Sequence, residues 1–93
     1  LLQVHGAEQV EHRLVKLLLM MSDIYGESDN GGIEIRHRIS QSHLASLVGA
    51  SRQWTNKTIN SLRRRGLIDS RSNHIVLKDI NGLKSIIAGR YIS

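Results

Sequence analysis

Apolar residues recur at helical spacing near the start of the chain. Between residues 8 and 25 they follow i, i+4, i+7, i+8 and i+11, which predicts an amphipathic helix, and this stripe is formed by Val10, Leu14, Leu17, Leu18 and Met21. We expect Gly26 to end that helix and the polar stretch 27–32 to form a loop. Strict alternation of apolar and polar positions from Ile33 to Ile39 then predicts a strand with one polar face.

The stretch from Ile39 to Ile68 predicts two short helices joined by a tight turn. Ser40 has a side-chain oxygen suited to cap the first helix. That helix has an apolar stripe, formed by Leu44, Leu47 and Val48. Gly49 suits the left-handed conformation that ends a helix, and Ser51 can cap a second helix two residues later. Helix, glycine turn and helix in this order predict a helix-turn-helix motif.

The last part of the chain predicts a hairpin and one further helix. Leu67–Ile68 begins a strand, Asp69–Asn73 forms a polar loop, and His74–Leu77 returns as the second strand. Asp79 caps the final helix, Gly89 closes it, and its apolar stripe is Ile80, Leu83, Ile86 and Ile87. The predicted fold class is α+β: a winged helix-turn-helix with a three-helix core, a small antiparallel sheet and a C-terminal helix.

The second helix of the motif, residues 51–65, has two contrasting sides. At roughly 100° per residue, one side gathers hydrogen-bond donors without an acid or an apolar residue. We call this set the polar arc: Arg52, Gln53, Asn56, Lys57, Asn60, Arg63 and Arg64. The opposite side holds Trp54, Thr55, Thr58, Ile59 and Leu62. Ordinary solvated faces mix both signs of charge, whereas Arg, Lys, Asn and Gln read base edges in a major groove, so the pattern favours a recognition helix.

The distribution of charge supports this hypothesis. The chain has 13 Lys and Arg against 8 Asp and Glu, a net charge of +5. No acid lies between Glu34 and Asp69, a segment whose basic residues are Arg36, Arg38, Arg52, Lys57, Arg63, Arg64 and Arg65. Such a concentration is the pattern expected of a protein that binds the phosphate backbone. A membrane surface would attract it too, but no amphipathic helix here pairs basic residues with large exposed apolar ones.

Other chemistries find little support in the sequence. A length of 93 residues indicates one domain. The chain has no cysteine, which excludes disulfides and zinc–thiolate sites and is compatible with a reducing cytoplasm. The longest apolar run, Leu17–Met21, is too short to span a bilayer. The histidines lack ligand spacing, and no phosphate-binding glycine loop or nucleophile elbow occurs, so we expect no metal, no cofactor in this chain and no enzymatic activity.

The helix-turn-helix stretch also resembles a known family. The string I-S-x-x-x-L-A-x-L-V-G-A-S-R-Q, followed by I-x-x-L-x-x-x-G-L-I, is similar to the DNA-binding domain of the Crp-Fnr superfamily of bacterial transcription regulators. The similarity covers about Val10 to Ala88. It implies a winged-helix DNA-binding domain at residues 8–93, preceded at residues 1–7 by a hinge from a dimerisation helix. We therefore expect a piece of a longer homodimeric regulator that binds inverted-repeat double-stranded DNA and senses a small-molecule effector through an N-terminal domain.

The resemblance also implies roles for individual residues. Arg52 matches the arginine that reads guanine, and Gln53 and Lys57 stand where relatives carry Glu and Arg; with Asn56 they form the expected base-reading set. The expected contacts to the DNA backbone are Gln41, Ser51, Trp54, Asn60, Arg63, Arg64, Arg71 and Asn73. The ring of Trp54 could instead fill a groove at the edge of the core. Glu11 stands where a relative contacts phosphate, and an acid there would repel it.

Two further expectations concern partners. The family implies a cytoplasmic protein without a membrane partner, and its activators touch RNA polymerase partly through a loop that corresponds here to Ser28–Gly32. The alternative function is a winged-helix interaction module whose basic face binds an acidic protein. The amides Gln53, Asn56 and Asn60 among the arginines favour DNA, because base reading needs amides and matching of charge does not.

Overall fold

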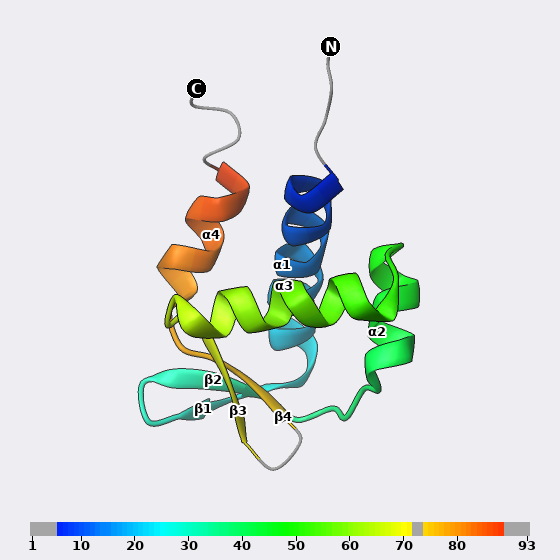
Figure 1. The fold of residues 1–93 in the computed structure, drawn as a ribbon. Coiled ribbons are helices and arrows are strands. Elements are labelled where there is room, and N and C mark those ends of the chain that lie inside the picture. The colour runs from blue at the N-terminus through cyan, green and yellow to red at the C-terminus, as the bar shows by residue number, and fades with distance from the viewer. Residues whose placement is uncertain (1–5, 72–73, 89–93) are drawn as a thin grey trace.

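The computed structural model describes residues 6–71 and 74–88 of the chain. Its elements are α1 (Gly6–Tyr25), β1 (Gly26–Asp29), β2 (Gly32–Ile35), α2 (Gln41–Val48), α3 (Arg52–Arg64), β3 (Ile68–Arg71), β4 (His74–Leu77) and α4 (Ile80–Ala88). The strands form an antiparallel sheet in the order β1-β2-β4-β3. Helices α1 and α4 run side by side above this sheet, and α3 crosses α1 (Figure 1). The predicted winged helix-turn-helix fold is confirmed.

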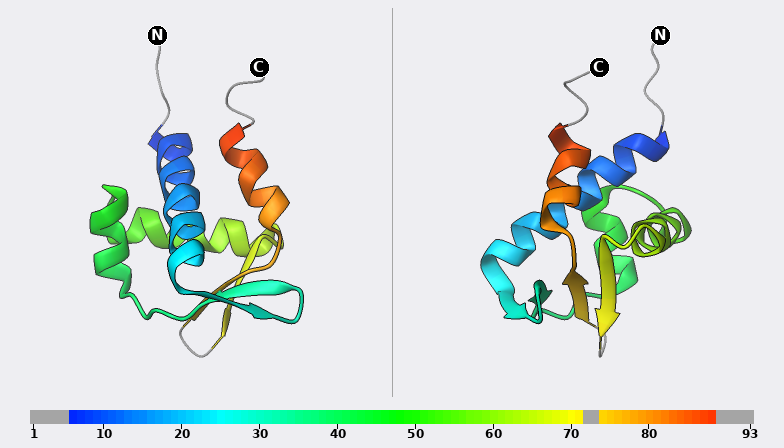
Figure 2. Two further views of the ribbon diagram at one scale, coloured as in Figure 1. Left: turned by 180° about the vertical axis from the view of Figure 1, so that it is seen from behind. Right: turned by 90° about the vertical axis from the view of Figure 1, so that its left-hand side faces the viewer.

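Helix α1 forms the centre of the hydrophobic core. The predicted stripe faces inward: Leu14 and Leu18 are fully buried, Val10 and Met21 nearly so, and Leu17 is half-buried. This helix contacts α2, α3, α4 and the β1–β2 hairpin (Figure 2). Because burial of apolar surface is the main favourable term in folding, α1 is the element against which the others are placed.

The helix-turn-helix motif is capped as the sequence predicts. Oγ of Ser40 accepts a hydrogen bond of 3.1 Å from the backbone N–H of His43, and Oγ of Ser51 accepts one of 3.0 Å from Trp54. Gly49 has a φ of 81°, the left-handed conformation expected at the end of α2. From α1, Nη1 of Arg13 donates 3.2 Å to the carbonyl of Val48, so a cation lies at the negative end of α2 and ties it to α1.

The predicted loop at 27–32 is wrong. Residues 26–29 form β1, which pairs with β2 through the turn Asn30–Gly31. These turn residues have φ values of 46° and 87°, and two positive values in a row are the mark of the type I′ turn that Asn-Gly favours in hairpins. The polar composition of the segment therefore reflects a solvated hairpin rather than an irregular loop.

Two strand predictions also need correction. The strand predicted from Ile33 to Ile39 ends at Ile35, because β4 pairs with β2 at Ile33 and Glu34 and the chain then turns away towards α2. In the C-terminal hairpin, residues 69–71 belong to β3 rather than to a loop, since each has a backbone partner in β4. We call the β3–β4 hairpin the wing. Gly89, the predicted end of the last helix, lies outside the described residues, whereas Oδ1 of Asp79 accepts from Gly82 as predicted.

The apolar stripe predicted in α2 is wrong at one position. Leu44 is 1% exposed and Val48 is equally buried, but Leu47 is 54% exposed. Helix α2 is eight residues long, and its buried side is completed by Ala45 rather than by Leu47. A stripe at i, i+3, i+4 gives the period of a helix but not the width of the surface that its neighbours cover.

This difference generates a test on one helix. We expect Leu44→Ala to lower the free energy of unfolding by about 2–5 kcal/mol, because it leaves a cavity between α1, α2 and α3. Leu47→Ala should change it by less than about 0.5 kcal/mol, since the side chain is already in water. Denaturant unfolding followed by circular dichroism measures both. Equal losses for the two variants would contradict the placement of α2.

Candidate nucleic-acid interface

Helix α3 turns its polar arc away from the core. Its buried residues are Thr55, Thr58, Ile59 and Leu62, all on the opposite side of the helix. Arg52, Gln53 and Asn56 are exposed, and together with Gln41 from α2 they line a hollow of about 490 Å³. The structure thus brings three of the predicted base-reading residues together with one predicted backbone residue. Their amide and guanidinium groups can donate to base edges and, in the amides, accept as well.

Lys57 lies in a different hollow of the same helix. Its Nζ is 5.3 Å from the centroid of the Trp54 ring, within the range of a cation–π interaction. The two side chains line this hollow with Arg64 and with Glu11 from α1. Trp54 is 39% exposed, so its ring lies at the surface rather than in the core. The structure therefore groups Lys57 with two predicted backbone residues, Trp54 and Arg64.

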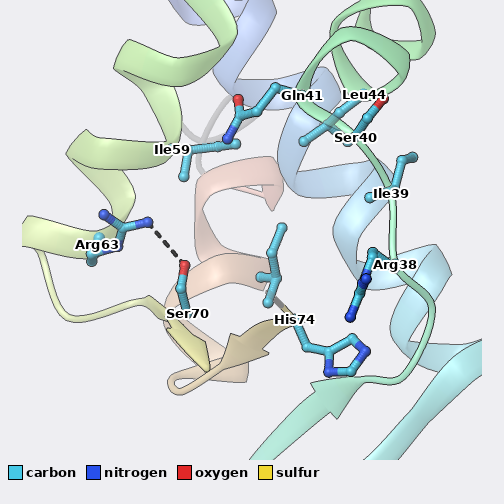
Figure 3. Close-up of a pocket in the computed structure, with 10 residues that line it drawn as sticks. Arg38, Ile39, Ser40, Gln41, Leu44, Ile59, Arg63, Ser70 and His74 are labelled. Atoms are coloured by element: carbon cyan, nitrogen blue, oxygen red, sulfur yellow. Dashed lines mark hydrogen bonds between the residues drawn. The ribbon is translucent and has the colours of Figure 1, made fainter. Parts of the chain in front are cut away.

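Arg63 connects α3 to the wing. Its Nη1 donates 3.1 Å to Oδ1 of Asn60 and its Nη2 donates 2.9 Å to Oγ of Ser70 in β3. The bond to Ser70 lies at the edge of a third hollow, of about 350 Å³, with Arg38 on the opposite side (Figure 3). Arg38 belongs to the basic segment but is not among the site residues expected from the sequence. Its place facing Arg63 is set by the irregular chain between β2 and α2, which no periodic pattern indicates.

Some of the basic residues are paired with acids and others are not. Arg36 lies 3.3 Å from Glu34, Arg65 lies 2.6 Å from Glu11, and Arg71 contacts Asp29. Within the described residues no carboxylate pairs with the remaining cations of the basic segment, which are Arg38, Arg52, Lys57, Arg63 and Arg64. Because an adjacent carboxylate cancels much of the field of an arginine, the uncompensated positive charge of the basic segment lies on α3 and beside it.

Glu11 and the wing differ most from what the sequence suggested. Glu11 was expected to repel phosphate, and the structure shows it holding Arg65 at the end of α3. Arg71 is the last residue of β3, opposite His74, and its guanidinium contacts the carboxylate of Asp29 in the neighbouring hairpin. Sequence reasoning missed both ion pairs, because the partners lie 54 and 42 residues apart along the chain. Asn73 lies outside the described residues.

Neither a metal centre nor a membrane span competes with this surface in the described part of the chain. Residues 6–71 and 74–88 contain no group of three or more His, Cys, Asp or Glu placed to hold a metal ion. No described helix has the length and apolar character needed to cross a bilayer. The surface offers phosphate-binding and base-reading groups on a capped helix-turn-helix. Fold and surface together define a winged helix-turn-helix DNA-binding domain.

Comparison with known proteins identifies the family. The model of the Crp-like helix-turn-helix domain matches residues 12–86, most of the chain. The chain therefore belongs to the Crp-like helix-turn-helix family, the DNA-binding domains of Crp-Fnr transcription regulators, as its sequence indicated. Relatives in this family are regulators rather than enzymes, which also agrees with the prediction from sequence.

Individual relatives support this assignment. A CRP-like cAMP-activated global transcriptional regulator of Mycobacterium tuberculosis is 31% identical over 70 residues, which are 75% of this chain and 31% of that protein. A putative HTH-type transcriptional regulator, ycf28, of Porphyra purpurea is 27% identical over 84% of this chain and 33% of its own length. The chain spans about a third of each of these relatives.

Solved structures agree with the sequence relatives. A CRP/FNR family transcriptional regulator from Thermus thermophilus superposes with a TM-score of 0.73 at 29% identity, over 84% of this chain and 40% of that one. Reduced CprK without ligand superposes with a TM-score of 0.76 over 91% of this chain and 39% of its own, and at 18% identity it shows the fold alone.

Neighbouring arginines at the end of α3 allow a matched test of the charge distribution. We expect Arg64→Ala to weaken binding to all DNA sequences alike and to lower the slope of log affinity against log salt by about 0.9, the loss of one phosphate contact. Arg65→Ala should leave that slope nearly unchanged, since Glu11 already compensates its charge. Fluorescence anisotropy at several salt concentrations measures the slopes. Equal effects of the two substitutions would refute the distinction between paired and unpaired arginines.

Proposed function

We propose that this domain binds double-stranded DNA sequence-specifically by placing α3 in the major groove. The observation that carries the proposal is the exposed side of α3, which presents guanidinium and amide groups without an acid among them. Its buried side is anchored on α1 and α2, so the polar arc is held at a fixed angle on the surface. A rigid helix that projects donors of this kind matches the docking of helix-turn-helix proteins on base edges.

The proposed base-reading residues are those nearest the start of α3. Arg52 can donate two hydrogen bonds to O6 and N7 of guanine, and the amides of Gln53 and Asn56 can donate and accept as adenine requires. Their shared hollow with Gln41 supports a common role at one edge of the groove. Lys57 completes the base-reading set proposed from sequence, and its Nζ lies over the ring of Trp54.

Backbone contacts are proposed for residues around this set. Gln41 and Ser51 lie at the beginnings of α2 and α3, where free backbone N–H groups favour phosphate. The other proposed contacts are Trp54, Asn60, Arg63, Arg64 and Asn73, the last of these from sequence alone. Arg71, also expected from sequence, would have to leave Asp29 to reach a phosphate. Arg63 is held by Asn60 and Ser70, which are neutral, so its position is fixed while its charge remains available.

The regulator as a whole is proposed to be larger than this domain. The relative from Mycobacterium tuberculosis is cAMP-activated, and CprK has been solved with o-chlorophenolacetic acid. By analogy, a small-molecule effector would bind outside the chain described here. The hinge to a dimerisation helix is proposed from sequence at residues 1–7, of which Gly6 and Ala7 already belong to α1. We further propose a homodimer in the cytoplasm that binds inverted repeats and touches RNA polymerase through Ser28–Gly32, the segment that contains the β1–β2 turn.

The competing function is an interaction module for an acidic protein. A basic surface alone would serve that function as well, because matching of charge needs no particular geometry. The amides within the polar arc favour DNA. Selection of sequences from random duplex DNA discriminates between the two functions: DNA reading yields a consensus, whereas an interaction module yields none.

The base-reading assignment is tested at Gln53. A carboxamide matches N6 and N7 of adenine, whereas a carboxylate can only accept, as from N4 of cytosine. We therefore expect Gln53→Glu to shift the preference at one base pair per half-site from adenine to cytosine by about 1–3 kcal/mol, with the guanine read by Arg52 retained. Selection from random DNA with both proteins measures the shift. Uniformly weaker binding with an unchanged consensus would place Gln53 beside the backbone instead.

The proposed assembly has its own test. Two copies of the domain joined to restore a two-fold arrangement should prefer inverted repeats whose half-sites are about 34–36 Å apart, one turn of the duplex. A series of sites with altered spacing, assayed for affinity with the same tethered protein, measures this preference. Equal affinity for direct and inverted repeats would argue against a two-fold symmetric regulator.

A further inference from the structure

Both basic side chains in the described part of the wing contact acids of the neighbouring hairpin. A guanidinium nitrogen of Arg71 contacts Oδ2 of Asp29 in β1, and Nδ1 of His74 lies 3.0 Å from Oε2 of Glu34 in β2. The carboxylates come from one element, the β1–β2 hairpin, which the sheet order places on the far side of β4 from β3. The ion pair at Arg71 and the side-chain contact at His74 thus tie the wing to this hairpin, in addition to the backbone pairing of β2 with β4.

Because Asp29 contacts the guanidinium of Arg71, a DNA phosphate would have to compete with Asp29 for that group. The side chain of Asp29 is 20% exposed, whereas that of Arg71 is 48% exposed and opens to solvent at the end of β3. Asp29 directly precedes the Asn30–Gly31 turn, whose positive φ values fix the backbone next to it. A phosphate that approached the wing would therefore meet an arginine whose charge is already compensated.

Arg63 of α3 also contacts the wing, but no acid among the described residues compensates its charge. Its partners, Oδ1 of Asn60 and Oγ of Ser70, orient the guanidinium without cancelling its charge. Ser70 and Arg71 are adjacent in β3, so one strand positions one arginine with a neutral group and ends in another that is held by an acid. Arg63 and Arg71 therefore differ in the charge of their partners, although both contacts are made at the same part of β3.

We propose that Asp29 sets the DNA affinity of the wing by withholding Arg71 from the phosphate backbone. This inference rests on the proposed DNA-binding function and concerns how strongly, rather than whether, the domain binds. The positive charge that the wing offers to DNA is then determined on β1, outside the helix-turn-helix. Loss of the Asp29 charge converts Arg71 into an additional phosphate-binding residue.

The experiment compares four proteins with the wild type on one duplex: Asp29→Asn, Arg71→Ala, the double variant, and Glu27→Gln as control. Glu27 lies on the same hairpin and approaches Arg36 at 4.0 Å, so this control removes a charge from β1 without freeing Arg71. We expect Asp29→Asn to tighten binding by roughly two- to fivefold, the range of an exposed salt bridge. The slope of log affinity against log salt should steepen by about 0.9.

The remaining variants identify the origin of that gain. Arg71→Ala alone should change affinity less than Arg64→Ala does, and it should abolish the gain in the Asp29→Asn background. Glu27→Gln should leave affinity nearly unchanged. A gain that survives Arg71→Ala, or that Glu27→Gln reproduces, would overturn the proposal in favour of a general effect of charge; so would the absence of any gain. Unfolding curves confirm that each variant is folded, and a wild-type protein that fails to bind DNA would refute the proposed function instead.

Discussion

The structure depends on the burial of one side of α3. Thr55, Ile59 and Leu62 are 0–3% exposed, and their packing leaves the polar arc no orientation except outward. The left-handed turn at Gly49 and the bond from Arg13 to the carbonyl of Val48 fix the position of α2, which packs against α3. Apolar burial therefore fixes the angle at which the polar arc, which is proposed to read bases, is presented to solvent.

The basic residues fall into two groups according to whether an acid lies beside them. Arginines at the margins of the surface, Arg36, Arg65 and Arg71, have carboxylate partners, whereas those of α3 have neutral partners or none among the described residues. Surface salt bridges contribute little to stability, so these acids act mainly on the field around the domain. The uncompensated cations of the basic segment thus lie on and beside α3, which accords with membership of the Crp-like family.

The sequence predicted features that depend on local chemistry and missed those that depend on distant partners. The caps at Ser40 and Ser51 and the turn at Gly49 followed from residue type alone. The Asn30–Gly31 dipeptide is typical of a hairpin turn, whereas the polar composition around it is typical of a loop, and the structure follows the dipeptide. The pairing of Asp29 with Arg71 depends on the sheet order, and the exposure of Leu47 depends on how far α1 and α3 cover α2, which no periodicity states.

One measurement tests the central claim most directly: the affinity of the unmodified domain for duplex DNA as a function of salt concentration. If the uncompensated cations on and beside α3 meet phosphates, log affinity should fall linearly with log salt, with a slope of about 0.9 for each phosphate contacted. A slope that corresponds to several phosphates is the predicted result. A slope near zero, or binding that is stronger to an acidic protein than to any duplex, would contradict the account.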